Sequence, residues 1–163
     1  MHDDRLEVST RQATLDDADA IRDLITESDA LHAHELPALF RVPEQPRFSR
    51  DDIADILAND EAEIFVAEHL GTVVGFIYLE IEWATSAHRM PTRSCWVSNI
   101  VVRPAARRQG IGRRLMDVAE AWAHRKDLLQ IKFFVWEFNR GAVAFYEQLG
   151  YTTLKREMWR SRE

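Results

Sequence analysis

The sequence predicts an α+β protein in which helices flank one mixed, mostly antiparallel sheet of about seven strands. The first observation behind this prediction is the order of the elements, β-α-α-β-β-β-α-β-α-β-β, in which an antiparallel meander precedes a β-α-β crossover. The second is size and composition: 163 residues, of which 46% are hydrophobic and 29% charged, fit a single globular domain spanning residues 1–163.

Composition also excludes several classes of protein. Six glycines and five prolines are too few for a low-complexity or collagen-like chain. No segment approaches the roughly 20 apolar residues that span a bilayer, and the first residues lack the pattern of a signal peptide. We therefore expect a cytoplasmic protein that does not bind membranes. Its single cysteine, Cys95, allows no internal disulfide, which agrees with a reducing compartment.

The chain is predicted to begin with a short strand and a helix. Leu6–Thr10 is β-compatible, and Asp16 or Asp17 is a candidate cap for the first helix. Residues at helical spacing indicate the helix itself, namely Ile21, Leu24, Ile25 and Ser28.

A loop and a second helix follow. Three prolines within His32–Phe48 predict a loop over the domain, because proline lacks a backbone donor and restricts the residue before it. Ser49 and Asp52 form a variant of the capping box, with aspartate at its third helical position. The apolar residues that continue this second helix are Ile53, Ile56 and Leu57.

Two β-rich runs predict a hairpin. Glu63–Glu68 and Val73–Trp83 flank the short turn His69–Thr72, which contains a glycine. Because side chains alternate along a strand, one face of the second run carries two acids beside two aromatic residues. The members of that face are Phe76, Tyr78, Glu80 and Glu82.

The next segments are predicted as a loop, a strand and a helix. Ala84–Arg93 is rich in turn-forming residues, and Ser94–Val102 reads as a long strand that stops before Pro104. A helix begins near Gly110. Its apolar stripe consists of Ile111, Leu115, Val118 and Trp122.

The end of the chain is predicted to complete the sheet. Ile131–Val135 reads as a strand and Arg140–Leu149 as a helix. A closing pair of strands is expected at Tyr151–Thr153 and Glu157–Trp159.

Positive charge is concentrated in one part of an acidic protein. The chain has a formal net charge of −6, yet five arginines and no acid lie within residues 103–114. Such a cluster favours a small phosphate-bearing ligand over a long nucleic acid, although arginine is also the usual surface cation of this chain. The arginines concerned are Arg103, Arg107, Arg108, Arg113 and Arg114.

A glycine-containing motif lies within this cluster. Arg107 to Gly112 has the form R-x-x-G-x-G and connects the strand ending at Val102 to the helix near Gly110. A strand, a glycine loop and a helix N-terminus bring several backbone N–H groups to one point, where the helix dipole adds positive potential. We therefore expect phosphate to bind there. The motif lacks the Gly-Lys-Ser/Thr of a Walker loop, and Leu115 stands where a dinucleotide fingerprint has its third glycine.

Three sequence blocks, the second of which contains this motif, resemble in their order and spacing those of the GNAT superfamily of N-acetyltransferases. They are Val97 to Pro104, Arg107 to Met116 and Asn139 to Tyr151. The resemblance implies the fold of that superfamily, with a splayed pair of strands at the cofactor site, and the use of acetyl-CoA as acyl donor. It also implies that Asn139 contacts the pantetheine arm and that Tyr146 protonates the departing thiolate. The other cofactor-binding residues that the resemblance implies are Ile100, Val101, Val102, Arg107, Arg108, Gln109, Gly110, Ile111, Gly112 and Arg113.

The acceptor side is less strongly marked in the sequence. An amine must lose a proton before it attacks, so a base or a path to solvent is expected. Relatives often carry acids where this chain has Ser98 and Asn99. We therefore take Glu82 as the first candidate base, with Glu80 less favoured and His34 as an alternative. His32 and His34 are spaced for a metal, but no convincing third ligand follows, so no metal site is expected.

These observations predict an N-acetyltransferase that transfers the acetyl group directly to a primary amine of a small molecule or peptide. Cys95 lies far from the motif along its strand, which argues against a covalent intermediate on the enzyme. Two alternatives remain at this point: a non-catalytic acetyl-CoA-binding sensor module, and a nucleic-acid binder built on the arginine cluster. The sequence also leaves a homodimer open.

Overall fold

The computed structural model of the chain describes residues 7–160. These residues form five β-strands and four α-helices, together with two short 3₁₀ turns. The chain divides into two compact units, the first ending at Phe133 and the second beginning at Phe134. In the described part no helix is long and apolar enough to cross a membrane.

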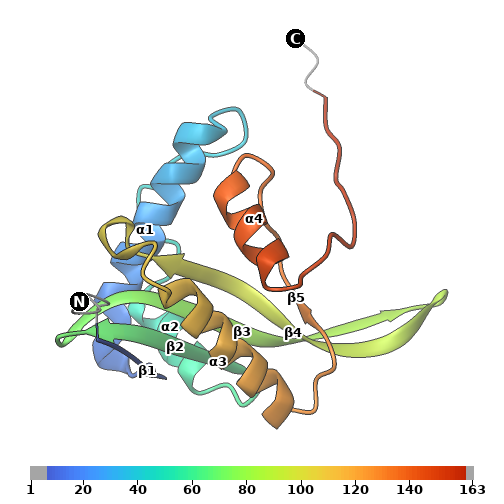
Figure 1. The fold of residues 1–163 in the computed structure, drawn as a ribbon, viewed down its shortest axis with the longest axis horizontal. Helices are drawn as coiled ribbons and strands as arrows, with labels where there is room; N and C mark the ends of the chain where they lie inside the picture. The colour runs from blue at the N-terminus through green and yellow to red at the C-terminus, as the bar shows by residue number, and fades with distance from the viewer. Residues whose placement is uncertain (1–6, 161–163) are drawn as a thin grey trace, which may run out of the picture. The chain divides into compact units, whose positions relative to one another are not determined.

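The five strands of the first unit make one sheet in the order β1-β2-β3-β4-β5. Strands β1 to β4 are antiparallel to one another in turn, and β5 runs parallel to β4 (Figure 1). The strands are β1 Val8–Gln12, β2 Ala62–His69, β3 Thr72–Ser86, β4 Arg89–Val102 and β5 Ile131–Lys132.

Helices cover both faces of this sheet. Figure 1 shows α3 on one face and α1 and α2 on the other. The helices of the first unit are α1 Ala18–Glu35, α2 Arg50–Leu57 and α3 Ile111–Arg125. The two 3₁₀ turns are Leu15–Asp17, before α1, and Pro104–Ala106, between β4 and α3. Two-sided cover explains why β2 and β3 read as nearly continuous hydrophobic runs.

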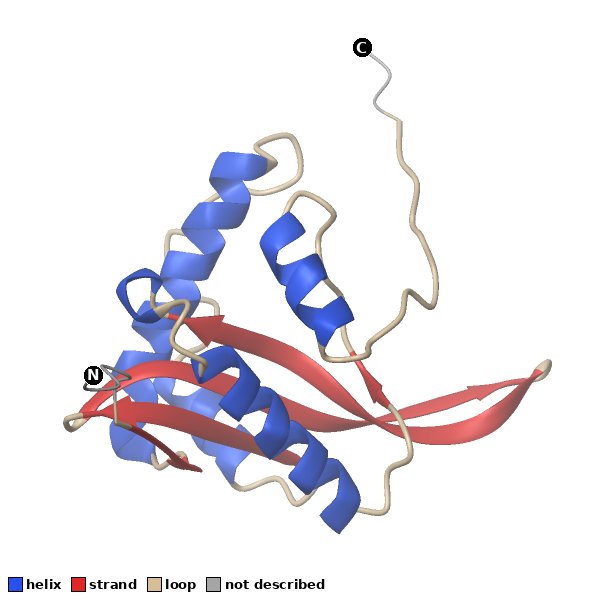
Figure 2. Cartoon of the chain, viewed as in Figure 1, coloured by secondary structure: helices blue, strands red, loops and turns tan. Residues whose placement is uncertain are grey.

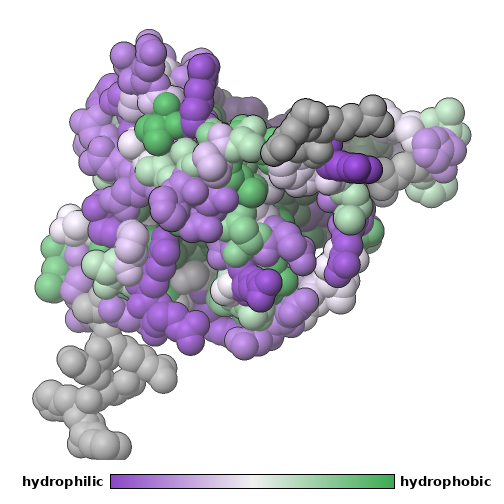
Figure 3. Space-filling view, turned by 90° about the horizontal axis from the view of Figure 1, so that it is seen from above, coloured by the Kyte–Doolittle hydropathy of each residue, from purple (hydrophilic) through white to green (hydrophobic). Residues whose placement is uncertain are grey.

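The α1 and α2 side of the sheet holds a dense core. Ile21 and Leu24 of α1 and Ile53 of α2 pack with Phe76 and Val101 of the sheet, and all of these are buried. On α3 three members of the predicted apolar stripe are confirmed, because Ile111, Leu115 and Trp122 are each at most 1% exposed, whereas Val118 is only half-buried. The face of the molecule drawn in Figure 3 is mostly hydrophilic, with scattered hydrophobic residues.

Two local predictions are confirmed. Ser49 and Asp52 form the reciprocal capping box of α2, in which the Ser49 N–H donates to Asp52 Oδ2 at 2.7 Å. The predicted hairpin of β2 and β3 turns at Leu70 and Gly71, both with positive φ (48° and 76°), as a two-residue turn requires.

Two predicted loops were too long. α1 continues to Glu35, because the proline restriction begins at Leu36, the residue before Pro37, so His32–Glu35 are helical. Most residues of the predicted loop Ala84–Arg93 are instead part of β3 and β4. These two strands extend beyond the others as a two-stranded ribbon (Figure 2). Pro91 is accepted there because it lies on an edge strand.

The predicted number of strands was wrong. β5 has two residues rather than five, and residues 151–160 form no strand (Figure 2). Their composition is β-compatible, but short strands are stable only when a sheet edge pairs with them. The second unit instead consists of α4 Arg140–Gln148 and irregular chain. The predicted first strand is shifted as β1, and its start at Leu6 lies outside the described residues.

Candidate active site

The outer edge of β4 opens next to the glycine motif. The ladder between β4 and β5 contains only Cys95–Ile131 and Trp96–Lys132, so β5 leaves β4 at Trp96. Arg103 N–H donates to the Val74 carbonyl of β3 at 2.8 Å. Since backbone groups alternate between the two edges of a strand, those of Ile100 and Val102 point away from β3.

The Val102 carbonyl on this edge has a partner. Arg107 Nε donates to it at 3.1 Å, which fixes the start of the glycine loop to the end of β4. The Ile100 N–H, the Ile100 carbonyl and the Val102 N–H are the other groups on this edge. A donor and an acceptor in this arrangement suit an extended amide chain.

The glycine loop presents backbone N–H groups at the start of α3. Gly110 has φ +80° and Arg108 has φ +65°, so the loop turns twice through the left-handed region. The first hydrogen bond of the α3 helix runs from the Arg114 N–H to the carbonyl of Gly110, the residue that precedes the helix, at 3.1 Å. The N–H groups of Ile111, Gly112 and Arg113 therefore precede the helical ladder and remain available for an anion.

The polar side chains beside this loop are partly engaged. Arg103 Nη1 donates to Glu27 Oε1 of α1 at 3.1 Å and ties the end of β4 to that helix. Gln109 Oε1 is buried and has no hydrogen-bond partner among residues 7–160. A buried amide oxygen without a donor is costly and fits a site that a bound ligand or water completes.

Gly75 allows β3 to approach the site edge closely. A Cβ at this position would lie 2.8 Å from the Val101 carbonyl oxygen and 3.4 Å from the Val102 Cα. Both are backbone atoms, which cannot rotate aside. The spacing of β3 and β4 at the site therefore depends on a residue without a side chain.

Three polar side chains meet on the sheet face that carries α1 and α2. Tyr78 Oη donates to Glu80 Oε2 at 2.9 Å, and Ser98 Oγ donates to Glu80 Oε1. Burial, together with the Glu80 hydrogen bond, raises the pKa of the Tyr78 phenol far above its usual range. The Tyr78 ring packs edge-on against Phe48 of the loop before α2, with ring centroids 6.2 Å apart.

A β-bulge brings Ser98 to this cluster. Tyr78 is opposite Asn99 and Leu79 is opposite Val97, so Ser98 is the extra residue of β4. Simple alternation places Ser98 and Asn99 on opposite faces, and a bulge redirects a side chain. The contact of Ser98 with Glu80 was not predicted, because no local signal in the sequence marks the bulge.

Glu82, the base favoured by the sequence, is held in an ion pair. Its Oε2 accepts from Lys132 Nζ at 2.8 Å and from Ser94 Oγ at 3.0 Å. The predicted common face of Glu80 and Glu82 is observed, but the structure gives them different partners.

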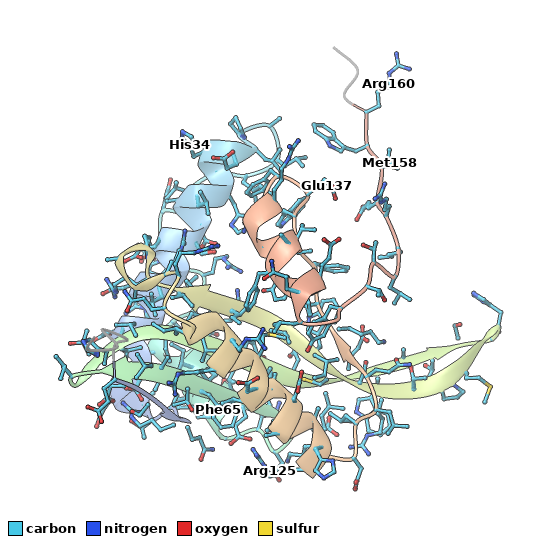
Figure 4. The ribbon with its side chains drawn as sticks, in the orientation of Figure 1. His34, Phe65, Arg125, Glu137, Met158 and Arg160 are labelled. Carbon is cyan, nitrogen blue, oxygen red and sulfur yellow. The ribbon has the colours of Figure 1, made fainter. Side chains whose placement is uncertain are left out.

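The histidine candidates are at the end of α1. His34 is 82% exposed in its side chain, pairs with Glu35 at 3.2 Å and lies at the end of α1 far from the sheet (Figure 4). His32 Nδ1 is 2.7 Å from the Ser28 carbonyl, and its ring packs against Phe40. The contacts of His32 are those of a structural residue.

The second unit carries the remaining predicted residues, Asn139 and Tyr146. Asn139 caps α4, where its Oδ1 accepts from the Ala142 N–H at 3.2 Å, so its amide nitrogen is not used by the cap. Burial, with a smaller effect of Tyr151, raises the pKa of Tyr146 to about 12. Tyr146 is therefore a neutral phenol near pH 7, which is the form that can donate a proton.

Cys95 has the properties of a structural thiol. It is fully buried, and burial raises the pKa of the thiol to about 12. A thiol must ionise to act as a nucleophile, so this environment disfavours covalent catalysis by Cys95.

Comparison with known proteins agrees with this geometry. A family model described as acetyltransferase (GNAT) family matches residues 28–151, which confirms the resemblance predicted from the sequence. An uncharacterized N-acetyltransferase of Methanocaldococcus jannaschii is 29% identical over 96 residues, which are 59% of this chain and 42% of that protein. A mycothiol acetyltransferase of Thermobispora bispora is 34% identical over 93 residues, which are 57% of this chain and 31% of that protein. The chain thus spans less than half the length of these relatives.

Solved structures share the fold. A protein from Bacillus halodurans superposes with a TM-score of 0.89 at 20% identity, covering 95% of this chain and 99% of that one. An aminoglycoside N-acetyltransferase solved in complex with CoA superposes with a TM-score of 0.71 at 17% identity, again covering 95% and 99%. At these identities the likeness shows the architecture.

Proposed function

The chain belongs to the acetyltransferase (GNAT) family, and from this premise we propose that it moves an acetyl group from acetyl-CoA to a primary amine of a small molecule or peptide. The observation that carries the proposal is the open edge of β4. There Ile100 and Val102 point backbone groups outward, directly before a glycine loop and the N-terminus of α3. This sequence of groups suits an amide arm followed by a pyrophosphate.

Each part of the acyl donor has a matching group on this chain. The backbone groups of Ile100 and Val102 would pair with the pantetheine amides, with the Val102 carbonyl reserved for Arg107, whereas the backbone groups of Val101, also predicted to bind the cofactor, face β3. The N–H groups from Arg108 to Arg113, with Gln109, Gly110, Ile111 and Gly112 between them, would hold the pyrophosphate. The side chains of Arg107, Arg108 and Arg113 add positive charge, and the Asn139 amide nitrogen would reach the donor's arm.

The reaction we propose is direct attack in a ternary complex. The neutral amine attacks the acetyl carbonyl carbon, and a backbone N–H of β4 stabilises the developing oxyanion. Tyr146 supplies a proton to the departing CoA thiolate. A phenol is neutral near pH 7 and so has a proton to donate.

The acceptor is proposed to be a cationic amine. The solved relative is named an aminoglycoside acetyltransferase and the curated relative a mycothiol acetyltransferase. On this chain, Glu80 and Glu82 lie on the sheet face that α1 and α2 cover, and Glu82 is paired with Lys132. His34 and Glu82 remain candidates for the base, but the exposure of His34 and the Lys132 ion pair of Glu82 weaken both.

An amine screen tests the proposed function. Purified protein is incubated with acetyl-CoA and a panel of n-butylamine, tyramine, spermidine, kanamycin and a glycyl peptide amide, and thiol release is measured together with the acetylated product. We expect at least one amine to be acetylated. Saturable acetyl-CoA binding without any product would indicate the sensor module instead, and absence of both would contradict the proposal.

The role of Tyr146 is tested on the best amine of that panel. Tyr146→Phe should lower kcat by roughly 10- to 1000-fold, because a general acid contributes about that much, and should leave acetyl-CoA affinity nearly unchanged. Tyr151→Phe is the matched control, since it removes a neighbouring phenol in contact with the Tyr146 ring. An unaltered kcat in the Tyr146 variant would remove it from the mechanism.

A further inference from the structure

We propose, resting on the function proposed above, that Glu80 is the proton acceptor for the acceptor amine and that Ser98 relays the proton to it. Glu80, Ser98 and Tyr78 form a hydrogen-bonded cluster that joins β3 to the bulge of β4. Ser98 lies two residues before Ile100, where the outward-facing backbone groups begin. This proposal reverses the order in which the sequence ranked Glu82 and Glu80.

The cluster lies where the covered sheet face begins to open. Along this face of β3, Phe76 is 1% exposed, Tyr78 and Glu80 are half-buried, and the Glu82 side chain is 39% exposed. Glu80 is therefore partly shielded from water yet next to a surface that a ligand can reach.

The loop before α2 fixes the covered side of the cluster. Arg22 Nε of α1 donates to the Phe48 carbonyl at 3.1 Å, and Arg47 Nε pairs with Asp29 of α1 at 2.8 Å. Phe48 in turn packs on the Tyr78 ring. These contacts hold the Tyr78 hydroxyl in place to donate to Glu80.

Charged neighbours distinguish Glu80 from Glu82. The Glu82 carboxylate pairs with Lys132 Nζ of β5 at 2.8 Å. Among the residues that the structure describes, no cation pairs with Glu80. Arg22 of α1 and Arg47 of the following loop are directed to the Phe48 carbonyl and to Asp29.

The hydrogen bonds also fix the direction of proton transfer. Because the Ser98 hydroxyl donates to Glu80, its oxygen lone pairs are left to accept a hydrogen bond from an ammonium group. Tyr78, whose high pKa keeps it protonated, donates to the other Glu80 oxygen. The carboxylate thus accepts a hydrogen bond from a neutral donor on each of its two oxygens.

The proton balance of the step is complete. The ammonium gives one proton to Ser98 Oγ while the Ser98 hydroxyl proton passes to Glu80, which leaves a neutral amine and a protonated carboxyl. The amine nitrogen then forms the C–N bond and the C–S bond breaks. Tyr146 protonates the departing thiolate. The adduct loses the second amine proton, and this proton reaches the Tyr146 phenolate through solvent. Glu80 returns its proton to solvent.

Four variants test the proposal through the pH dependence of kcat/KM on the best amine of the panel. Glu80→Gln should lower kcat/KM at neutral pH by about 10²- to 10⁴-fold and move its rise to higher pH, because the rate then follows the neutral fraction of the free amine. Ser98→Ala should shift the profile in the same direction. Ser94→Ala is the matched control: it removes the serine that donates to Glu82 from the same strand, and should keep the wild-type profile. A shift in Glu82→Gln but not in Glu80→Gln would overturn the proposal.

A second readout separates this proposal from the proposed function. Binding of n-butylammonium to the full chain, without acetyl-CoA, is followed by NMR chemical shifts and should be saturable in wild type and lost in Glu80→Gln. Thermal melting and acetyl-CoA binding establish that each variant is folded. If no amine is acetylated, the proposed function fails, and n-butylammonium binding then tests only whether Glu80 contacts the amine. Binding that is absent from wild type, or unchanged in Glu80→Gln, would overturn the Glu80 proposal.

Discussion

At the scale of single residues, Arg11 and Asp17 form the best-defined ion pair of the fold. The Arg11 guanidinium donates to both Asp17 oxygens, at 2.8 and 2.9 Å, and the Thr14 N–H donates to the same carboxylate at 2.8 Å. Asp17 is 6% exposed, so its charge depends on these donors. They lower the pKa of Asp17, with the Arg11 hydrogen bonds as the largest cause.

This pair predicts how stability depends on pH. Asp17 has a lower pKa when folded than when unfolded, so its stabilisation is present above about pH 4 and is lost as pH falls through the folded pKa. Asp17→Asn should lower the free energy of unfolding by about 1–3 kcal/mol at pH 7. The difference from wild type should shrink in acid, as measured by urea unfolding across pH.

The neighbouring acid provides the control. Asp16 is exposed in the same 3₁₀ turn, and Asp16→Asn should change the free energy of unfolding by less than about 0.5 kcal/mol. A gap between wild type and Asp17→Asn that stayed constant down to pH 2 would contradict the assignment.

At the scale of elements, the contact of β3 with β4 sets the shape of the donor site. Gly75→Ala places a Cβ 2.8 Å from the Val101 carbonyl oxygen, so the strands must separate. We expect a loss of about 1–3 kcal/mol in the free energy of unfolding. Acetyl-CoA should also bind more weakly, because Val102 moves with its strand. Calorimetric titration and urea unfolding measure the two effects.

Gly141→Ala is the matched control for this change. A Cβ on Gly141 of α4 meets nothing within 4 Å, so the same added methyl group has room. Stability should stay within about 1 kcal/mol of wild type and acetyl-CoA affinity should not change. Equal effects of the two substitutions would show that steric contact at Gly75 is not what shapes the edge.

Local patterns predicted most elements because their causes are local. The Ser49 capping box and the stripe containing Leu115 each act within one or two turns of helix. The prediction of two closing strands was wrong because Tyr151–Thr153 would need a sheet edge to pair with, and the rest of the chain determines where such an edge lies. The bulge at Ser98 likewise depends on how β3 and β4 are aligned.

At the scale of the whole molecule, the candidate site depends on contacts between distant parts of the chain. Alternation placed Glu80 and Glu82 on one face, but only folding brings Lys132, 50 residues away, to Glu82. The glycine motif could be recognised from the sequence, and the roles of Tyr146 and of either carboxylate stay predictions; the Lys132 partner of Glu82 could not be foreseen. Which carboxylate has a cationic partner depends on contacts between residues far apart in the chain, and the sequence alone does not show these contacts.

The most direct test of the central claim is calorimetric titration of acetyl-CoA into wild type and Gly112→Asp, checked by thermal melting. We predict one saturable site in wild type, with a melting temperature that rises with ligand, since a ligand concentration of 100 times the Kd adds about 2.7 kcal/mol of stability. In Gly112→Asp, a carboxylate at the N-terminus of α3 would repel the pyrophosphate and abolish both signals. Binding of equal affinity to both proteins, or to neither, would contradict the assignment of the glycine loop as the donor site.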